Sequence, residues 1–168
     1  MKILVTGGLG FIGSNFILKL LQKENDFDII NVDAKLFGSN PHNLDEIKNS
    51  VRYEFVSGNI TNKNLMNELV SKCDSVINFA AETFVDRSIK DANPFLVSNI
   101  RGAFTLMDIT TKQNKRFVQI STDEVFGSLE STTATEDSKF NPSSPYAATK
   151  AAAELLANSY SVTYDSDI

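Results

Sequence analysis

The stretch VTGGLGFIGSN, residues 5–15, decides the fold. A short apolar run, KILVT (2–6), leads into Gly7, Gly10 and Gly13, and a segment with apolar residues at helical spacing follows. In such a strand–loop–helix turn, the first glycine permits the tight turn, the second lets the backbone approach a pyrophosphate, and the third allows close packing of the helix. The backbone N–H groups at the positive end of the helix would hold the anion. Residues 5–15 therefore predict a dinucleotide-binding loop.

A second apolar run, DIINVD (28–33), ends at Asp33, which follows Gly13 by 20 residues. An acidic residue at this place can accept hydrogen bonds from the adenine ribose hydroxyls and would repel a 2′-phosphate, which favours NAD over NADP. Lys35 is near enough to contribute to the cofactor site, and its charge weakens that preference. The alternative is that Asp33 is a capping or solvated aspartate.

Apolar runs alternate with segments of helical spacing along the whole chain. This alternation predicts an α/β fold, a Rossmann-type, doubly wound parallel sheet flanked by helices, with residues 1–168 forming one NAD-binding domain. After the first two strands and the helix over 11–24, we expect a strand and a turn over 53–60 and strands at 75–81 and 116–122. We expect further helices over 62–70 (with Thr61 as its cap), from Pro94 to about Thr111, and from Pro145 to about Tyr160.

Polar motifs stand where these expected strands end. Ligands of open parallel sheets bind at the carboxyl ends of the strands, where the strand order reverses, so these motifs predict one shared site. They are Gly7, Asp33, Asn59, the residues from Ala80 to Glu82, and the residues from Ser121 to Glu124.

Composition and charge narrow the possible functions. The hydrophobic content of 42% suits a soluble globular protein, and a net charge of −5 with a pI near 4.9 disfavours nucleic-acid binding. Cys73, the only cysteine, cannot form an internal disulfide, which favours a cytoplasmic location. No apolar stretch approaches the ~20 residues of a membrane span, and the first apolar run is too short for a signal peptide. With one histidine and one cysteine, we expect no metal site.

Two further motifs suggest chemistry. PYAATK (145–150) places Tyr146 and Lys150 on one helix face, where a neighbouring ammonium would lower the tyrosine pKa and let it remove a proton from a sugar hydroxyl. Taken alone, the pair is as well explained by chance. ISTDEVFG (120–127) offers adjacent carboxylates, Asp123 and Glu124, which a partly buried site can drive to different pKa values, one an acid and one a base. The alternative is that these are ordinary polar residues of a loop, with no role in chemistry.

Together these motifs resemble the N-terminal half of the extended short-chain dehydrogenases/reductases that act on nucleotide sugars, and most of all the dTDP-glucose 4,6-dehydratases. The resemblance extends over nearly the whole chain. Its glycine loop and Tyr-x-x-x-Lys pair are generic to the superfamily, whereas two other blocks are more specific to the dehydratases. The matching stretches are residues 5–15, NVDAKLFGSNPHNL (31–44), NFAAETFVDRSI (78–89), NIRGAF (99–104), ISTDEVFG (120–127) and PSSPYAATKAA (142–152).

The resemblance implies a lyase that uses NAD⁺ as a recycled oxidant. Tyr146 would take the proton of the sugar's 4-hydroxyl, Lys150 would hold the nicotinamide ribose, and Thr122 would hydrogen-bond at the 4-oxygen. Glu124 would remove the proton on carbon 5, and Asp123 would protonate the departing 6-hydroxyl. The cofactor contacts that carry over by position are Phe11 and Ile12 beside the pyrophosphate, Asn59 and Ile60 near the adenine, Ala80, Ala81 and Glu82 along the cofactor, and Asn99 near the nicotinamide.

The chain departs from the family pattern in three side chains and in length. Asn59 stands where the family usually has aspartate, Phe84 where it has histidine, and Phe126 where it has tyrosine. Family members are much longer, so we expect the C-terminal substrate domain to be missing. The resemblance also implies a homodimer through the helices at about 94–111 and 145–160. Two other functions stay open: a nucleotide-sugar epimerase or decarboxylase, and a non-catalytic NAD-binding fragment.

Overall fold

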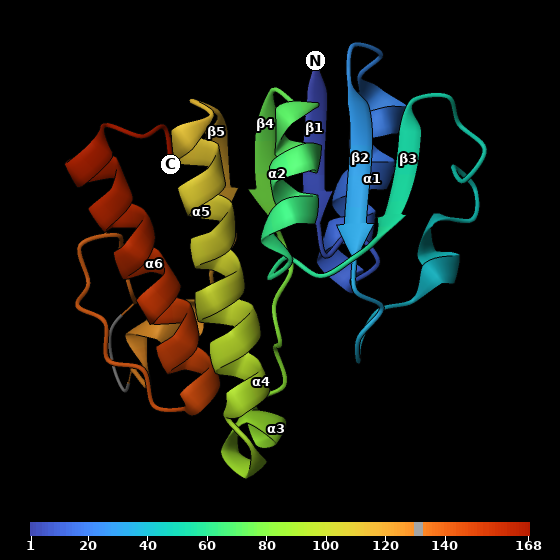
Figure 1. The fold of residues 1–168 in the computed structure, drawn as a ribbon. Helices are drawn as coiled ribbons and strands as arrows, with labels where there is room; N and C mark the ends of the chain where they lie inside the picture. The colour runs from blue at the N-terminus through green and yellow to red at the C-terminus, as the bar shows by residue number, and fades with distance from the viewer. Residues whose placement is uncertain (130–132) are drawn as a thin grey trace.

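A parallel sheet forms the centre of the molecule. The computed structural model describes residues 1–129 and 133–168, and within these residues five strands pair side by side in the order β3-β2-β1-β4-β5 (Figure 1). Because β1 is central and the chain turns in opposite directions on its two sides, the expected doubly wound arrangement is confirmed. The strands are β1 (Lys2–Thr6), β2 (Asp28–Asp33), β3 (Tyr53–Ser57), β4 (Ser75–Asn78) and β5 (Arg116–Gln119).

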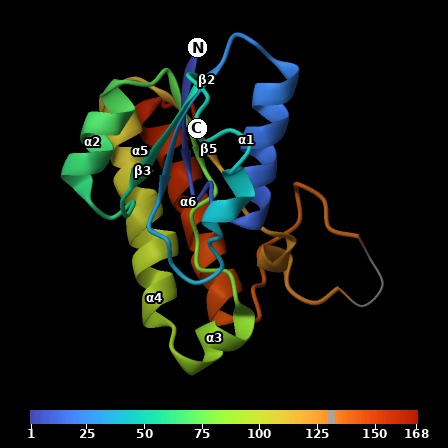
Figure 2. The same cartoon turned by 90° about the vertical axis from the view of Figure 1, so that its right-hand side faces the viewer.

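Helices cover both faces of this sheet, but unequally. Helices α2 (Lys63–Ser71), α5 (Ala103–Lys112) and α6 (Pro145–Tyr164) lie over one face, and α1 (Phe11–Lys23) lies over the other (Figures 1 and 2). Right-handed crossovers between parallel strands produce such a layered arrangement. The helix predicted to end near Tyr160 continues for another turn, and those predicted over 11–24 and 62–70 agree within one residue.

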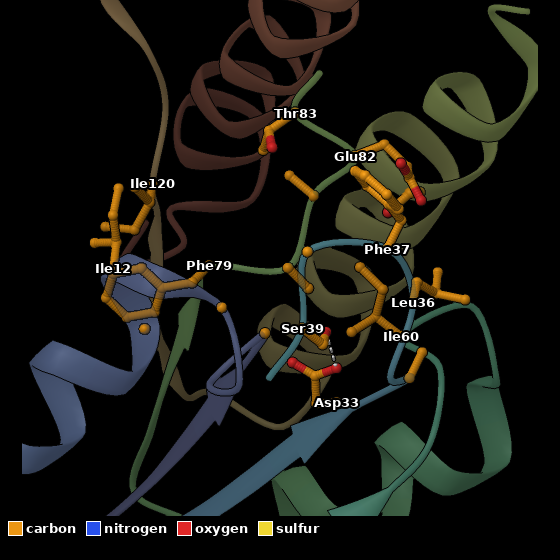
Figure 3. A pocket seen from close by; sticks show the side chains of 18 of the residues that line it. Ile12, Asp33, Leu36, Phe37, Ser39, Ile60, Phe79, Glu82, Thr83 and Ile120 are labelled. Atoms are coloured by element: carbon orange, nitrogen blue, oxygen red, sulfur yellow. Dashed lines mark hydrogen bonds between the residues drawn. The ribbon is translucent and has the colours of Figure 1, made fainter. Parts of the chain in front are cut away.

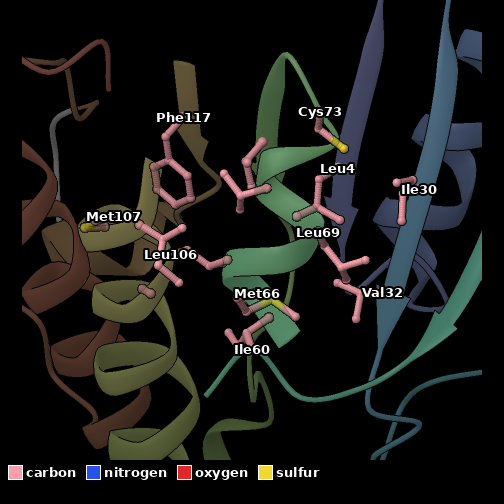
Figure 4. Packing of buried hydrophobic residues seen from close by; sticks show 14 of the residues in the cluster. Leu4, Ile30, Val32, Ile60, Met66, Leu69, Cys73, Leu106, Met107 and Phe117 are labelled. Atoms are coloured by element: carbon pink, nitrogen blue, oxygen red, sulfur yellow. The ribbon is translucent and has the colours of Figure 1, made fainter. Parts of the chain in front are cut away.

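Alternate residues of each strand supply two separate cores. Leu4 and Ile30 pack against α2 and α5 together with Met66 and Phe117 (Figure 4). Ile3 packs on the α1 side. This alternation follows from the two-residue period of a strand, which sends neighbouring side chains to opposite faces. Each fully buried Leu, Ile or Met side chain contributes about 1.5–3 kcal/mol. The sheet edge that carries the site is therefore held from both faces.

The helix predicted from Pro94 contains an irregular central part. Helix α4 (Asn93–Phe95) leads into the π-helical segment η2 (Leu96–Gly102), and α5 continues from it. A π-helical turn shifts the facing of the side chains within it and is often found at functional sites. Here it turns Asn99 into the protein interior, next to the segment that follows β4.

Two predicted strands extend too far at their carboxyl ends. β4 ends at Asn78 and β5 at Gln119, about three residues earlier than the apolar runs indicate, whereas β3 ends at Ser57 and is followed by a turn as predicted. The runs continue because the residues beyond the ladder are still partly buried, but they turn away from their neighbours and line a cavity. Three short helices follow the carboxyl ends and were not predicted: η1 (Pro41–Leu44), α3 (Val85–Lys90) and η3 (Asp123–Phe126).

Helix α2 is capped by a different residue from the one expected. The Asn62 side chain accepts the backbone N–H of Leu65 at 3.2 Å, whereas the Thr61 hydroxyl donates to the side chain of Asn59 at 2.8 Å. Asparagine and threonine are both good N-caps, and the tight turn over 59–62 decides which of them faces the first turn of the helix. In the ranges 1–129 and 133–168, no helix is both long enough and apolar enough to cross a bilayer.

Candidate active site

A cavity of about 380 Å³ opens at the carboxyl ends of the strands. Ile12, Phe79 and Ile120 lie on one side of it, and Leu36 and Phe37 lie on the other (Figure 3). Thirteen of the predicted cofactor residues line it: Gly7, Gly10, Phe11, Ile12, Gly13, Asp33, Asn59, Ile60, Ala80, Ala81, Glu82, Tyr146 and Lys150. The strand-end motifs are therefore brought together as predicted, except that only Ser121 of the residues from Ser121 to Glu124 lines the cavity.

The glycine loop has no room for side chains at two of its glycines. Gly7 has a φ of +71°, and a Cβ there would come within 2.5 Å of the backbone N of Ala80. A Cβ on Gly13 would come within 2.5 Å of the carbonyl oxygen of Gly7. Gly8, which the sequence analysis did not single out, packs against the side chain of Asn31 and donates its N–H to it at 3.1 Å. The loop is thus a close-packed cradle that ends at the free N–H groups of the first turn of α1, which fits a pyrophosphate group.

Asp33 ties two loops together at the floor of the cavity. Its carboxylate accepts the backbone N–H of Leu9 at 3.0 Å, the backbone N–H of Lys35 at 2.7 Å and the hydroxyl of Ser39 at 2.8 Å (Figure 3). A carboxylate has about four acceptor positions, so capacity remains for a ribose hydroxyl. Lys35 itself points away from the cavity, because its ammonium lies over the ring of Phe55, 5.0 Å from the centroid.

The segment after β4 forms one wall of the cavity, and hydrogen bonds from the side chain of Asn99 fix its position. The Asn99 side chain accepts the N–H of Glu82 at 2.8 Å and donates to its carbonyl oxygen at 2.9 Å and to Thr149 Oγ1 at 3.0 Å. Asn99 is buried and does not line the cavity, so its contact with a cofactor stays a prediction while its structural role is clear.

One carboxylate oxygen in this wall has no hydrogen-bond partner. Glu82 Oε2 is buried, and Nη1 of Arg87 is 3.9 Å away, which is too long for a hydrogen bond. Leaving a buried acceptor unpaired is costly, so this oxygen is suited to a donor that arrives with a ligand. Together with the glycine cradle, it indicates that the residues present fit a dinucleotide cofactor.

Tyr146 and Lys150 are both buried in the wall of the cavity, at 7% and 5% exposure. Burial raises the pKa of Tyr146 above its ordinary value of 10.0; a hydrogen bond with the Thr122 side chain lowers it, and the charges of Glu124 and Asp123 raise it further. The expected lowering of this pKa by Lys150 is therefore not found. The reason is geometric, because Lys150 Nζ donates to the carbonyl oxygen of residue 120 at 2.5 Å. Burial lowers the pKa of Lys150 to about 8, and Glu154 opposes that shift.

The acid–base pair lies beside Tyr146 but outside the cavity. Thr122 caps η3 by accepting the N–H of Glu124 at 3.3 Å, and both Asp123 and Glu124 are exposed to solvent. We expected this pair of carboxylates to be partly buried, and that expectation is wrong. No described helix or strand covers Asp123 or Glu124. Their charges nonetheless raise the pKa of Tyr146, so both carboxylates lie near the Tyr146 end of the cavity.

Several lining residues were not predicted. Phe37 and Phe84 meet edge to face with centroids 4.8 Å apart, and the guanidinium of Arg87 lies 4.3 Å from the Phe37 ring centre. The strand-end rule covers the first residues after a strand, whereas Phe37 and Phe84 follow several residues later. The unpredicted lining residues are Val32, Ala34, Leu36, Phe37, Gly38, Ser39, Gly58, Phe79, Thr83, Phe84, Ser98 and Ile120. The described part of the chain contains no group of three or more His, Cys, Asp or Glu side chains that could hold a metal ion.

Comparisons with known proteins agree with this geometry. The model of the family described as GDP-mannose 4,6 dehydratase matches residues 4–168. Among curated proteins, the low-salt glycan biosynthesis protein Agl12 of Haloferax volcanii is 44% identical over 98% of this chain and 53% of its own. A dTDP-glucose 4,6-dehydratase of Mycolicibacterium smegmatis is 40% identical over 98% of this chain and 50% of its own.

Solved structures extend the likeness to three dimensions. The crystal structure of DesIV, a dTDP-glucose 4,6-dehydratase from Streptomyces venezuelae with NAD bound, superposes with a TM-score of 0.95 at 40% identity. The superposition covers 99% of this chain and 53% of DesIV. The chain thus spans about half the length of the curated relatives and solved structures that it matches.

Proposed function

The chain belongs to the GDP-mannose 4,6 dehydratase family, and from this premise we propose that it is the cofactor-binding and catalytic half of an NAD-dependent nucleotide-sugar 4,6-dehydratase. The substrate we propose is dTDP-glucose, and the product is its 4-keto-6-deoxy derivative. One observation carries the proposal: the buried pair Tyr146 and Lys150 shares a cavity with the glycine loop and Asp33. A tyrosine that can take a proton, next to a loop that can hold a dinucleotide, is the arrangement that oxidation of a sugar hydroxyl requires.

The residues of the cavity divide the work of holding the cofactor. The cradle formed by Gly7, Gly10 and Gly13 would let the pyrophosphate approach the free N–H groups at the start of α1, and Asp33 would accept the adenine ribose hydroxyls. Lys150, whose ammonium is directed to a carbonyl group at the end of β5, would hold the nicotinamide ribose. When bound, NAD⁺ supplies the acceptor and later the donor of the hydride, so the dehydration needs no external oxidant.

The side chains at the reaction end would move protons. We propose that Tyr146 takes the proton of the 4-hydroxyl while Thr122, already hydrogen-bonded near it, steadies the 4-oxygen. Glu124 would remove the proton on carbon 5, which the adjacent ketone acidifies, and Asp123 would give a proton to the leaving 6-hydroxyl. An elimination needs one base and one acid, and Glu124 and Asp123 supply both within reach of Tyr146.

The same pair of carboxylates separates this proposal from the alternatives. A nucleotide-sugar epimerase or decarboxylase would use Tyr146 and Lys150 but has no elimination step for Asp123 and Glu124 to assist. A non-catalytic NAD-binding protein would need neither carboxylate. The electrostatic influence of both carboxylates on Tyr146 supports the dehydratase.

Assembly and location are further parts of the proposal. We propose a homodimer through the helices from Asn93 to Lys112 and α6, supported by exposed apolar residues on both: Leu96 and Phe104 on the first, and Leu155 and Val162 on the second. Burial of large apolar side chains at a helix–helix interface is a common source of dimer stability. Cys73 is an unpaired thiol buried in the core, which supports a reducing compartment such as the cytoplasm.

Incubation with dTDP-glucose and NAD⁺ tests the function. Both this chain and the full-length protein, with any sequence that follows residue 168, are assayed for the alkaline ultraviolet absorbance of a 4-keto-6-deoxy product. We expect turnover by the full-length protein and a loss of about 10²–10⁴-fold in Glu124→Gln, the usual contribution of a general base. NAD binding without turnover in either form would overturn the dehydratase in favour of the binding protein. An unchanged rate in Glu124→Gln would overturn the role of Glu124.

A further inference from the structure

Helix α6 presents three polar side chains, on successive turns, to the segment that follows β5. Tyr146, Lys150 and Glu154 are spaced by four residues and therefore share one face of the helix. Lys150 Nζ donates to the carbonyl oxygen of Ile120, and the Ser121 hydroxyl donates to Glu154. Glu154 is thus joined to the segment that carries the proposed catalytic residues, although it lies outside the cavity.

The charges around Lys150 single out Glu154. Lys150 is buried, and burial is the main reason why its pKa falls to about 8. Glu154 is the one charge that raises this pKa. In the described structure the two side chains form no direct ion pair, so the carboxylate acts across space from one turn further along the helix. The other titratable groups that face this end of the cavity are Tyr146 on α6, Asp123 and Glu124 on η3, and Glu82 after β4.

A surface glutamate at the same helical spacing gives a useful contrast. Glu68 on α2 pairs directly with Lys72 at 2.6 Å, and both side chains are exposed, so neither contacts a cavity. Exposed pairs of this kind contribute little to stability. Glu154 is instead half-buried, with its carboxylate occupied by Ser121, while the lysine one turn before it is buried.

We propose that Glu154 is a positioning residue of the active site, which fixes Ser121 against α6 and carries the negative charge that compensates the buried Lys150 ammonium. The role of Lys150 toward the cofactor ribose rests on the proposed function. The coupling between Glu154 and Lys150 is a property of this chain and can be measured without substrate or cofactor.

The coupling is measured by NMR titration of the protein labelled with ¹³C at the lysine ε-carbon, with Lys150→Arg to identify the resonance. Glu154→Gln keeps the shape and can still accept from Ser121, but it removes the charge. We expect the Lys150 midpoint to fall by about one pH unit, the lower end of the effect of a nearby opposite charge. Ser121→Ala removes only the hydrogen bond and should leave the midpoint within a few tenths of a unit. Glu68→Gln is the matched control and should leave it unchanged.

A structural role alone predicts a different pattern. If Ser121→Ala shifts the midpoint as much as Glu154→Gln does, or if neither shifts it, the inference is overturned. Should Glu154→Gln not fold, Glu154→Asp decides, because withdrawing the charge by one methylene should lower the midpoint by a smaller amount. An unchanged midpoint in Glu154→Asp would then overturn the inference.

Cofactor binding separates this inference from the proposed function. We expect the NAD affinity of the wild-type chain, followed by fluorescence titration, to decline as the pH rises through about 8. In Glu154→Gln the decline should begin about one unit lower, which makes binding about fivefold weaker at pH 8. Failure of the wild-type chain to bind NAD at any pH would overturn the proposed function but not the coupling. Normal NAD binding with identical pH profiles in both proteins would overturn the inference and leave the function standing.

Discussion

The two ends of the cavity are built differently. At the nucleotide end, defined as residues 7–13 with Asp33, every carboxylate oxygen of Asp33 already accepts a hydrogen bond, and the glycine backbone is fixed by close contacts. At the reaction end, defined as residues 120–124 with Tyr146 and Lys150, the tyrosine and lysine are buried but Asp123 and Glu124 are exposed. The nucleotide end is thus preformed in this chain, whereas the two carboxylates of the reaction end stand in solvent.

The difference has a local origin. The nucleotide end is made from one turn and the next strand, so its contacts lie close together in the sequence and are held by β1 and β2 in the middle of the sheet. The reaction end follows β5, the last strand of the described sheet, and its polar groups are held mainly by a helix that arrives about 25 residues later. Substitutions should therefore cost more folding free energy at the nucleotide end.

The largest effect should come from Gly7→Ala. A φ of +71° and a Cβ at 2.5 Å from a backbone nitrogen should lower the free energy of unfolding by about 3–5 kcal/mol, since strain and a backbone clash combine. Urea denaturation measures it. Gly10→Ala is the matched control: Gly10 has a φ of −73°, so that variant should lose less than about 1 kcal/mol. Equal losses in both would show that the nucleotide end is not held by its backbone conformation.

A pH series should reveal the buried ammonium of the reaction end. The pKa of Lys150 is about 8 in the folded protein against an ordinary value of 10.5, so the unfolded chain binds more protons between these pH values and stability rises with pH. Relative to Lys150→Met, the wild type should gain about 3 kcal/mol from pH 8 to 10.5. Burial raises the pKa of Cys73 to about 11, an effect of opposite sign that cancels because both proteins contain it. A constant difference across the series would contradict the buried charge.

Asn99→Ala tests the segment after β4, which lines the cavity between its nucleotide end and its reaction end. The substitution leaves the buried N–H and carbonyl group of Glu82 without partners and should lower the free energy of unfolding by about 2 kcal/mol. It should also weaken NAD binding, measured by calorimetry, because the segment after β4 is no longer fixed. Asn43→Ala, which removes a hydrogen bond from a partly buried amide to the Leu9 carbonyl, is the control and should have the smaller effect on stability.

The smallest effect on folding should come from Glu124→Gln. The side chain is exposed and capping is done by Thr122, so the free energy of unfolding should change by less than about 0.5 kcal/mol. NAD affinity should stay unchanged as well, while turnover by the full-length protein falls. A loss of more than about 1 kcal/mol would mean that the reaction end is as tightly built as the nucleotide end, and the contrast between them would fail.

Much of the fold follows from local sequence patterns. The apolar run before Gly7, the helical spacing after it and the position of Asp33 predict the first strand–helix–strand unit to within a residue. These features can be recognised in the sequence because the strand and helix periods, the turn glycines and the acidic residue all lie within about 30 residues of one another. The spacing of Tyr146 and Lys150 likewise predicts that both enter one cavity, and they do.

The misplaced features depend on contacts that no local pattern contains. β4 stops at Asn78 because its ladder with β1 ends there, although the apolar run continues. Lys150 does not lower the pKa of Tyr146 as predicted, since its ammonium is directed to a carbonyl group at the end of β5. The hydrogen bonds between the Asn99 side chain and the backbone of Glu82 depend on a π-helical turn that no local sequence pattern predicts.

By itself, the sequence determined that this protein has a doubly wound sheet with a dinucleotide loop, Asp33 and the Tyr146–Lys150 pair at one edge. These are consequences of residue type and spacing, which act over short stretches of chain. Only the tertiary structure decided which groups are buried, that Ile120 and Ser121 meet Lys150 and Glu154, and that Asp123 and Glu124 remain in solvent. Burial and charge depend on distances between elements far apart in the chain, and those distances exist only once the sheet and its helices have packed.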